Sequence, residues 1–378
     1  MLLAVILLVA FPVVYAEENT KNVPGGEPSV SARAAVLMDA DSGHVLFAKQ
    51  ESERLPMAST TKIMTSLLTL EASAVTDPVI TVTDEMVRVE GSSMGLMAGN
   101  KLALSDLATG MLMVSGNDAA NAAAIAVAGN VTEFAKLMNA RAEEIGMKNS
   151  HFVTPSGLDA EGHYSTAYDM ALLGAEALSN SRFAGIVSQK NMTVKYENPI
   201  QTIRYGNHNR LLSLYPDAIG IKTGFTKKAG RCLVSAAERD GVRLIAVTLN
   251  APDDWDDHIR LYEYGFSELQ PFRPDTAALS TVVPVVGGLS DTVTVAAGIA
   301  DPVSVKAQDV SRIQLRIELP QFVYAPVRQG ELIGSAVYLL DGRAVLEVPL
   351  LAQQGVECTQ LPKTRLQQLW DGIKSLFQ

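Results

Sequence analysis

Ser59-Thr60-Thr61-Lys62 is the stretch around which this 378-residue chain is organised, because the helical pattern of Thr61–Leu70 starts inside it. Ser59 falls at the expected helix start, where free backbone N–H groups and the helix dipole favour negative charge. Lys62 follows one turn later, so its amine can reach the Ser59 hydroxyl. The stretch predicts a nucleophilic serine with a lysine as its base. If this stretch stood alone, a capping serine beside a surface lysine would be the favoured explanation.

Two further motifs follow along the chain: Ser115-Gly116-Asn117 between two helical patterns, and Lys222-Thr223-Gly224 on a strand pattern. A lysine can act as a base only if its pKa falls, and burial together with a second positive charge lowers it. Lys222 is the expected second charge. Alone, Ser-Gly-Asn reads as a turn that caps a helix, and Lys-Thr-Gly is a common tripeptide. In this order and separation, the three motifs together favour an acyl-serine enzyme.

Each motif residue has an expected role in acyl transfer. Ser115 can pass a proton from Lys62 to a leaving amine, and Asn117 can hydrogen-bond Lys62 and the substrate amide. Thr223 offers a hydroxyl to a substrate carboxylate, and Gly224 lets the substrate backbone approach the strand edge.

Backbone groups complete the expected site. The N–H groups of Ser59 and Phe225 would form an oxyanion hole, in which each donor is typically worth about 3–4 kcal/mol. Lys222 supplies positive charge to Ser115 and to the substrate carboxylate.

The order of predicted elements indicates an α+β fold, with a sheet built from both ends of the domain and a cluster of helices between them. The expected strands are Ala34–Asp39, Val45–Ala48, Ile219–Thr223, Cys232–Ala237 and Leu244–Leu249. Ser105, Thr132 and Thr166 are the expected caps of three helices, and Asp256–Phe266 is a further helix. Residues 31–270 are interpreted as the catalytic domain.

The character of the chain changes near Pro271. Short Val-rich runs separated by turns predict a small all-β sandwich domain over residues 272–361. Residues 362–378 predict an amphipathic helix that lies in a membrane interface, with a helix docked on its own domain as the alternative. Its apolar residues at helical spacing are Leu366, Leu369, Trp370, Ile373 and Phe377.

The amino-terminal residues 1–16 are apolar and end in Val14-Tyr15-Ala16, which predicts a signal peptide cleaved after Ala16 and an exported protein. The formal net charge of −10 argues against nucleic acid as a partner. The histidines show no metal-binding spacing, so no metal and no other cofactor is expected. Cys232 and Cys358 are expected to be two free thiols.

The motifs, with Ser150-His151-Phe152 and Ser156-Gly157-Leu158-Asp159 between them, resemble those of serine-type D-alanyl-D-alanine carboxypeptidases, the low-molecular-mass penicillin-binding proteins. The resemblance covers nearly the whole chain. It implies a penicillin-recognising transpeptidase-like catalytic domain in which Ser59 is acylated by peptidoglycan stem peptides ending in D-Ala-D-Ala. It also implies that β-lactam antibiotics acylate Ser59, and that the enzyme works outside the cytoplasmic membrane and limits cell-wall cross-linking.

One segment departs from the family pattern. Some relatives have an arginine in the middle of an Asn-x-Asn segment, where this chain has His208, followed by Arg210. Either residue is a candidate for binding the substrate carboxylate beside Lys222.

Two other functions remain open from the sequence. A serine β-lactamase needs a glutamate for deacylation, and Glu176 with Asn180 has the matching spacing. A non-catalytic cell-wall binding protein is the second alternative.

Overall fold

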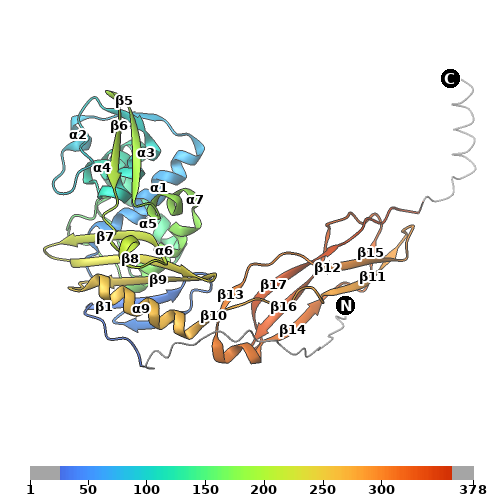
Figure 1. Cartoon of the computed structure of the whole chain (residues 1–378). Coiled ribbons are helices and arrows are strands. Elements are labelled where there is room, and N and C mark those ends of the chain that lie inside the picture. The colour runs from blue at the N-terminus through green and yellow to red at the C-terminus, as the bar shows by residue number, and fades with distance from the viewer. Residues whose placement is uncertain (1–25, 360–378) are drawn as a thin grey trace, which may run out of the picture. The chain divides into compact units, whose positions relative to one another are not determined.

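The structure is a computed structural model and describes residues 26–359, so the predicted signal peptide and the predicted helix over 362–378 lie outside the described residues. The chain divides after Pro271 into two compact units, and strand β10 (Leu269–Phe272) spans the division. Figure 1 labels the elements of both units, each of which is described here by itself.

The first unit is built on a five-stranded antiparallel sheet in the order β2-β1-β9-β8-β7. These strands are β1 (Ala34–Asp39), β2 (Val45–Lys49), β7 (Ala218–Thr226), β8 (Gly230–Arg239) and β9 (Val242–Leu249). Strands from both ends of the unit are therefore neighbours, as the sequence predicts. The Lys222-Thr223-Gly224 motif lies on β7, at the edge of the sheet.

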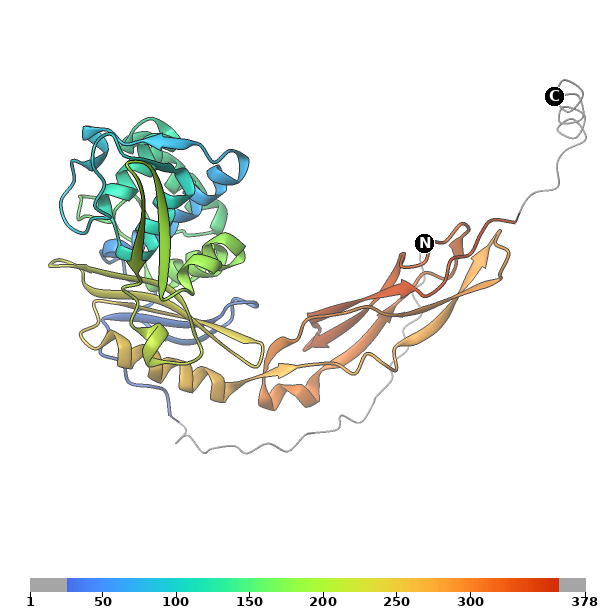
Figure 2. The same cartoon turned by 45° about the horizontal axis from the view of Figure 1, so that its top comes forward.

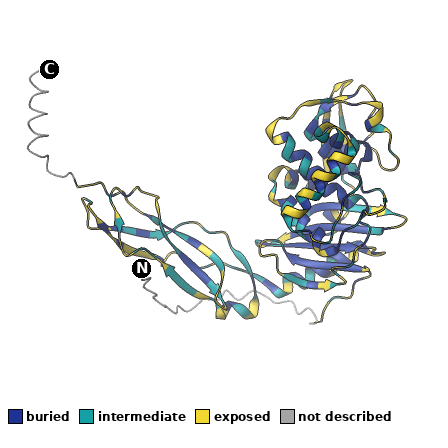
Figure 3. Cartoon of the chain, turned by 180° about the vertical axis from the view of Figure 1, so that it is seen from behind, coloured by how far each residue is buried: buried dark blue, intermediate teal, exposed yellow. Residues whose placement is uncertain are grey.

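Helices cover both faces of this sheet, and the alternation of side chains along β1 shows why. Val36 and Met38 pack in one apolar cluster with helix α6 (Ala167–Ser179), whereas Leu37 packs in a second cluster with helix α9 (Asp254–Glu268). Successive residues of a strand point to opposite faces, so a strand buried on both faces is apolar throughout. Figure 2 shows α9 against the sheet, and the dark blue colour in Figure 3 marks the buried strands of this sheet.

The remaining helices of this unit bring the first two motifs together. They are α1 (Lys62–Val75), α2 (Asp84–Val87), α3 (Leu104–Val114), α4 (Asn117–Ala128), α5 (Val131–Ile145), α7 (Ser181–Val187) and α8 (Leu211–Leu214). Helix α1 contacts both α3 and α4. The buried side of α4 is made of alanines, whose small side chains allow this close approach.

Of the three predicted helix caps, one is confirmed. The Thr166 hydroxyl accepts the N–H of Asp169 at 3.1 Å and caps α6. Ser105 is not a cap, because α3 begins one residue earlier and the Ser105 hydroxyl donates to Asp77 instead. Helix α5 is capped by Asn130 rather than Thr132.

A four-stranded sheet in the order β3-β4-β5-β6 is absent from the sequence prediction. It consists of β3 (Val79–Thr81), β4 (Lys101–Ala103), β5 (Asn191–Asn198) and β6 (Ile200–Gly206). Strand β5 alternates polar and apolar residues from Asn191 to Glu197, with the apolar ones turned inward, so this strand had a clear signal that the sequence prediction left out. The two strands are joined to the rest of the unit by Tyr205, whose hydroxyl donates to Met94 O at 2.9 Å.

The second unit is rich in strands, as expected from its Val-rich runs. Its largest sheet has the order β14-β16-β17-β12-β11-β15, and valines dominate the apolar cluster around β11 and β12. The strands are β11 (Ser280–Val286), β12 (Thr292–Ala297), β13 (Val303–Lys306), β14 (Gln314–Glu318), β15 (Val323–Tyr324), β16 (Leu332–Leu340) and β17 (Arg343–Ala352). A 3₁₀ turn, η2 (Ala307–Arg312), follows β13. Across residues 26–359, no helix has the length and apolarity needed to cross a membrane.

Candidate active site

Ser59 lies in the 3₁₀ turn η1 (Ala58–Thr61), directly before α1. The residue before it, Ala58, has a φ of 48°, a left-handed conformation that is uncommon for residues other than glycine. The hydroxyl of Thr60 donates to Met57 O at 2.6 Å and ties the turn together. Residues held in sparsely populated backbone regions are often found at functional sites.

The amine of Lys62 is buried and has three partners. Its Nζ lies 3.0 Å from Ser59 Oγ, 2.6 Å from Asn117 Oδ1 and 2.5 Å from the carbonyl oxygen of Ser156. A neutral amine has two N–H groups and one lone pair. The amide and carbonyl oxygens can accept the two N–H groups, which leaves the lone pair for the Ser59 hydroxyl proton.

The environment of this amine favours the neutral form. The pKa of Lys62 is lowered well below its usual value of 10.5, chiefly by burial and further by the charge of Lys222, whereas Asp118 opposes the shift. Burial also lowers the pKa of Lys222, to about 7. The Lys222 amine donates to the carbonyl of Thr223 at 2.9 Å. Burial thus lowers the pKa of both lysines, and at Lys62 the charge of Lys222 adds to the effect.

The Ser-Gly-Asn motif joins α3 to α4, and Ser115 adopts a left-handed conformation with a φ of 60° at the end of α3. Asn117 Oδ1 accepts a hydrogen bond from the Lys62 amine, and Asn117 Nδ2 donates one to Glu90 O at 2.7 Å. Its side-chain orientation is therefore fixed from both sides. A Cβ on Gly116 would lie 2.9 Å from Met94 N, so only glycine fits between the motif and the loop over residues 90–97.

Asp118, which the sequence analysis overlooked, holds this loop in place. Its buried carboxylate accepts the backbone N–H groups of Met94, Gly95 and Leu96 and the hydroxyl of Ser93. An acidic residue after Ser-Gly-Asn looks like an ordinary first-turn residue of a helix in the sequence, which gives no sign of the loop that it binds.

Strand β7 passes directly beside η1. A Cβ on Gly224 would lie 3.0 Å from both Ser59 N and Thr60 N, and 3.1 Å from Met57 O. Glycine at this position thus permits the close approach of the strand to the turn that carries Ser59, whereas the sequence suggested that it makes room for substrate. Thr223 is half-buried next to it, and Phe225 is 65% exposed.

His208 and Arg210 lie in the segment between β6 and α8. The backbone N–H of His208 donates to Met113 O at 3.0 Å, close to the end of α3. The pKa of the His208 ring is lowered by partial burial and by the charge of Lys222. Arg210 is exposed at the start of α8, where its carbonyl accepts the N–H of Ser213. The structure therefore brings His208 into the field of Lys222 but gives Arg210 no such contact.

A further loop, over residues 150–164, supplies the carbonyl of Ser156. A Cβ on Gly157, which has a φ of 82°, would lie 2.0 Å from Ala58 O, so the loop packs tightly on η1. The ring of His163 joins the two segments, with Nε2 3.0 Å from Thr61 Oγ1 and Nδ1 accepting the N–H of Val153 at 2.9 Å. The glycine of Ser156-Gly157 was the one signal in the sequence for this contact.

The glutamate proposed for a β-lactamase is engaged elsewhere. Glu176 forms an ion pair with Arg141 of α5, which also pairs with Glu71 of α1. Asn180 accepts the N–H groups of Arg182 and Phe183 and caps α7. Both residues thus have structural roles that explain their presence.

The site has a serine beside a buried lysine that can lose its proton, and both lie next to the edge strand of a sheet with helices on both faces. These features define a serine hydrolase whose base is lysine rather than histidine. The D-alanyl-D-alanine carboxypeptidase family, Peptidase S11, matches residues 19–253, and the C-terminal domain of penicillin-binding protein 5 matches residues 267–358. The chain belongs to the D-alanyl-D-alanine carboxypeptidase family. The resemblance and the two-domain fold inferred from the sequence are confirmed, and the helix expected over 362–378 stays a prediction.

Individual relatives extend the match along the chain. The D-alanyl-D-alanine carboxypeptidase DacF of Bacillus subtilis is 32% identical, with 94% of this chain and 93% of the relative covered. DacC of Escherichia coli is 34% identical, with 92% and 88% covered. The crystal structure of penicillin-binding protein 5 from Haemophilus influenzae superimposes with a TM-score of 0.65 at 29% identity, covering 88% of this chain and 99% of that one. Neither the β-lactamase nor the non-catalytic alternative is favoured by these matches.

Proposed function

We propose that Ser59 is the nucleophile that removes the terminal D-Ala from peptidoglycan stem peptides, with Lys62 as its base. Ser59 Oγ attacks the carbonyl carbon of the penultimate D-Ala while its proton moves to Lys62 Nζ. The C–N bond breaks, the amine of the terminal D-Ala takes up a proton and leaves, and an ester to Ser59 remains. Water then hydrolyses the ester and restores the hydroxyl. β-Lactams acylate Ser59 by the same attack: the C–N bond of the four-membered ring breaks, the ring nitrogen takes up the proton and stays attached, and the resulting ester to Ser59 inhibits the enzyme.

The observation that carries this proposal is the set of three partners around Lys62 Nζ. Two of them accept N–H groups, so the lone pair of the neutral amine is directed at Ser59 Oγ, 3.0 Å away. Burial and Lys222 both favour that neutral form. Asn117 orients the base and also the substrate amide, and Ser115 carries the proton from Lys62 toward the leaving amine.

The strand motif is proposed to bind the free carboxylate of the substrate. Lys222 supplies charge and Thr223 a hydroxyl, whereas the N–H groups of Ser59 and Phe225 stabilise the oxyanion. Of the two candidates beside Lys222, His208 is favoured because it lies close enough to Lys222 for that charge to lower its pKa, so at neutral pH its ring would bind the carboxylate as a neutral hydrogen-bond donor. Arg210 is the alternative.

Release of D-Ala from a synthetic peptide ending in D-Ala-D-Ala tests the reaction. Ser59→Ala should abolish both release and covalent labelling by penicillin, because no nucleophile remains. Ser52→Ala is a matched control, since Ser52 lies in an exposed turn of the same unit and its hydroxyl has no hydrogen-bond partner among the described residues, so this variant should behave as the parent does. Penicillin labelling that survives in Ser59→Ala would place the nucleophile elsewhere.

Export and peripheral membrane attachment complete the proposal. Residues 1–16 act as the signal peptide, and residues 362–378 form an interfacial helix with Lys363, Arg365 and Lys374 available to anionic lipid. Deleting the chain from Thr364 onward should leave D-Ala release unchanged and reduce flotation with liposomes. Equal flotation of both proteins would contradict attachment through this segment.

A further inference from the structure

Four apolar side chains are exposed around the end of β11 in the second unit. Val286, Leu289, Phe322 and Tyr324 are 47%, 69%, 44% and 70% exposed, and we call them the tip patch. Parallel pairing places Tyr324 opposite Val286, and the rings of Phe322 and Tyr324 are in edge-to-face contact with centroids 5.3 Å apart. Large apolar side chains that gather on a surface, rather than scatter, mark a contact site.

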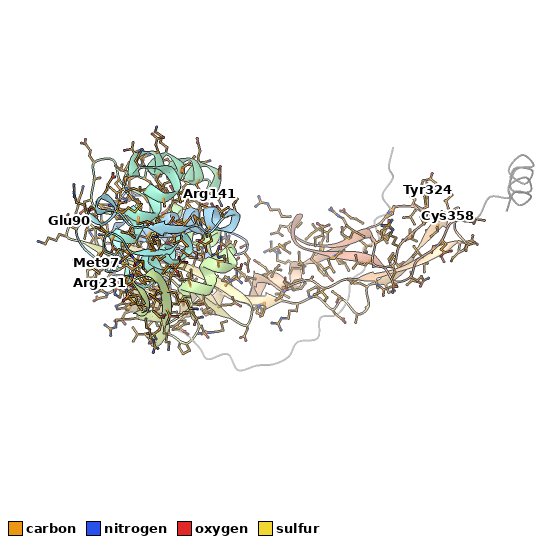
Figure 4. All side chains as sticks on the ribbon, turned by 90° about the horizontal axis from the view of Figure 1, so that it is seen from above. Glu90, Met97, Arg141, Arg231, Tyr324 and Cys358 are labelled. Atoms are coloured by element: carbon orange, nitrogen blue, oxygen red, sulfur yellow. The ribbon has the colours of Figure 1, made fainter. Side chains whose placement is uncertain are left out.

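The described part of the chain ends at the same place. Thr359 donates its N–H to Gly287 O at 2.8 Å and its hydroxyl to Gly288 O at 2.7 Å, next to the tip patch. Figure 4 labels Tyr324 and Cys358 at this end of the unit. The sequence that follows, with its five apolar residues at helical spacing, therefore continues directly from the patch.

We propose that the tip patch inserts into the interfacial layer of a phospholipid bilayer, as a contact separate from the terminal segment. Aromatic rings, tyrosine above all, are favoured at the level of the lipid headgroups, because one end is apolar and the other polar. A single weak membrane signal gives marginal, reversible binding, whereas two adjacent signals give stable attachment. This inference goes beyond the proposed reaction and does not depend on it.

The charges near the patch distinguish its lipid preference from that of the terminal segment. Asp291 and Glu357 are exposed beside it, and Arg328 and Glu331 offset each other nearby. The patch therefore gains nothing from anionic lipid. Its contribution should be no larger on anionic than on neutral vesicles, whereas the contribution of residues 362–378, which are net basic, should grow with anionic lipid.

Flotation with vesicles of phosphatidylcholine, with and without phosphatidylglycerol, tests this on the chain from Glu17 to Gln378. Leu289→Ser with Tyr324→Ser, which adds no charge, should weaken partitioning roughly tenfold on neutral vesicles and by no larger a factor on anionic ones. Ile299→Ser is the matched control. Ile299 is 95% exposed in the same unit, but it follows the end of β12 that lies away from the tip patch. This variant should therefore bind as the parent does. Unchanged flotation of the Leu289 and Tyr324 variant, with attachment lost on deletion from Thr364, would overturn the tip contact and leave the terminal helix standing.

The chain carries its own reporter for a second measurement. Cys358 is exposed, whereas Cys232 is buried and its thiol pKa is raised to about 12, so an environment-sensitive fluorophore labels Cys358 alone. Adding phosphatidylcholine vesicles should shift its emission to the blue. The same label on Ile299→Cys, in a Cys358→Ser background, should not respond.

Two other occupants of the patch would give different results, and each would overturn the proposal. If the terminal segment covers the patch, the labelled protein is already blue-shifted without vesicles, and deletion from Thr364 removes that shift. If a second copy of the chain covers it, the shift grows with protein concentration in the absence of lipid, and Leu289→Asp lowers the apparent mass in solution.

Discussion

At the scale of single residues, two buried lysines within one site are set for opposite tasks. Lys62 must be uncharged to accept a proton, and its pKa is lowered by burial and by Lys222. Lys222 must be charged to bind a carboxylate, and its pKa of about 7 keeps it partly protonated near neutrality. Their sequence motifs reveal the residue types but not this division, because both amines are buried and what differs is the set of charges and hydrogen-bond partners that the fold brings to each.

A pH profile should separate these tasks. The value of kcat/KM for a peptide ending in free D-Ala should fall as the pH rises above about 7, because Lys222 in the free enzyme loses its proton and its hold on the carboxylate. The same peptide with an amidated C-terminus lacks the carboxylate, so its profile should lack this fall. Rates of release of the terminal residue, measured from pH 5 to 9, provide the test. An identical fall for both peptides would mean that Lys222 does not recognise the carboxylate.

His208 provides the companion measurement. If it shares the carboxylate with Lys222, His208→Gln should raise KM for the free peptide several-fold and leave the amidated peptide unaffected. Arg210→Gln should change neither value. The reverse result, with Arg210 as the sensitive position, would mean that Arg210, at the start of α8, shares the carboxylate with Lys222.

At the scale of elements, the site depends on the fit of β7 against η1. The sequence predicted both elements and their motifs, since helix starts and alternating strands are local patterns. It could not predict that Gly224 lies against Ser59 N, that the carbonyl of Ser156 reaches Lys62, or that Asp118 holds a loop. Each of these contacts joins segments distant in sequence, and all three involve backbone atoms that carry no residue-specific signal.

Gly224→Ala should expose this dependence. The added methyl would lie 3.0 Å from Ser59 N and Thr60 N, so the turn must move away from the strand. We expect a folded protein whose acylation by penicillin is slower by about a hundredfold, because small displacements of reacting groups are costly. Gly206→Ala is the control, since its Cβ would have nothing closer than 3.7 Å. A normal acylation rate in Gly224→Ala would show that the turn accommodates the methyl group.

At the scale of the whole molecule, the first unit has two buried, neutral histidines that make its stability depend on pH. The ring of His258 lies between Ser235 and Thr248, and burial lowers its pKa to about 3. Burial likewise lowers the pKa of His163 to about 4. An unfolded histidine titrates near 6.5, so between these values the unfolded chain binds more protons than the folded one.

Stability should therefore be full above pH 6.5 and should fall as the pH drops from there toward 4 and then 3. Urea unfolding followed by circular dichroism at pH 7.5 and pH 5 measures the difference. His258→Gln should be less stable at pH 7.5 but should lose less on acidification than the parent. His44→Gln is the control, because His44 is exposed. If His258→Gln shows the same acid sensitivity as the parent, the ionisation of this histidine is not its source.

The contact between Lys62 and the Ser156 carbonyl has a consequence for how the enzyme can vary over time. Every residue has a backbone carbonyl, so a mutation at position 156 changes the side chain but keeps the oxygen that accepts the hydrogen bond from Lys62. The neighbouring position has no such freedom, because any side chain at Gly157 would collide with Ala58 O. Ser156 is itself buried, so libraries of active variants should contain several small residues at position 156 but only glycine at 157.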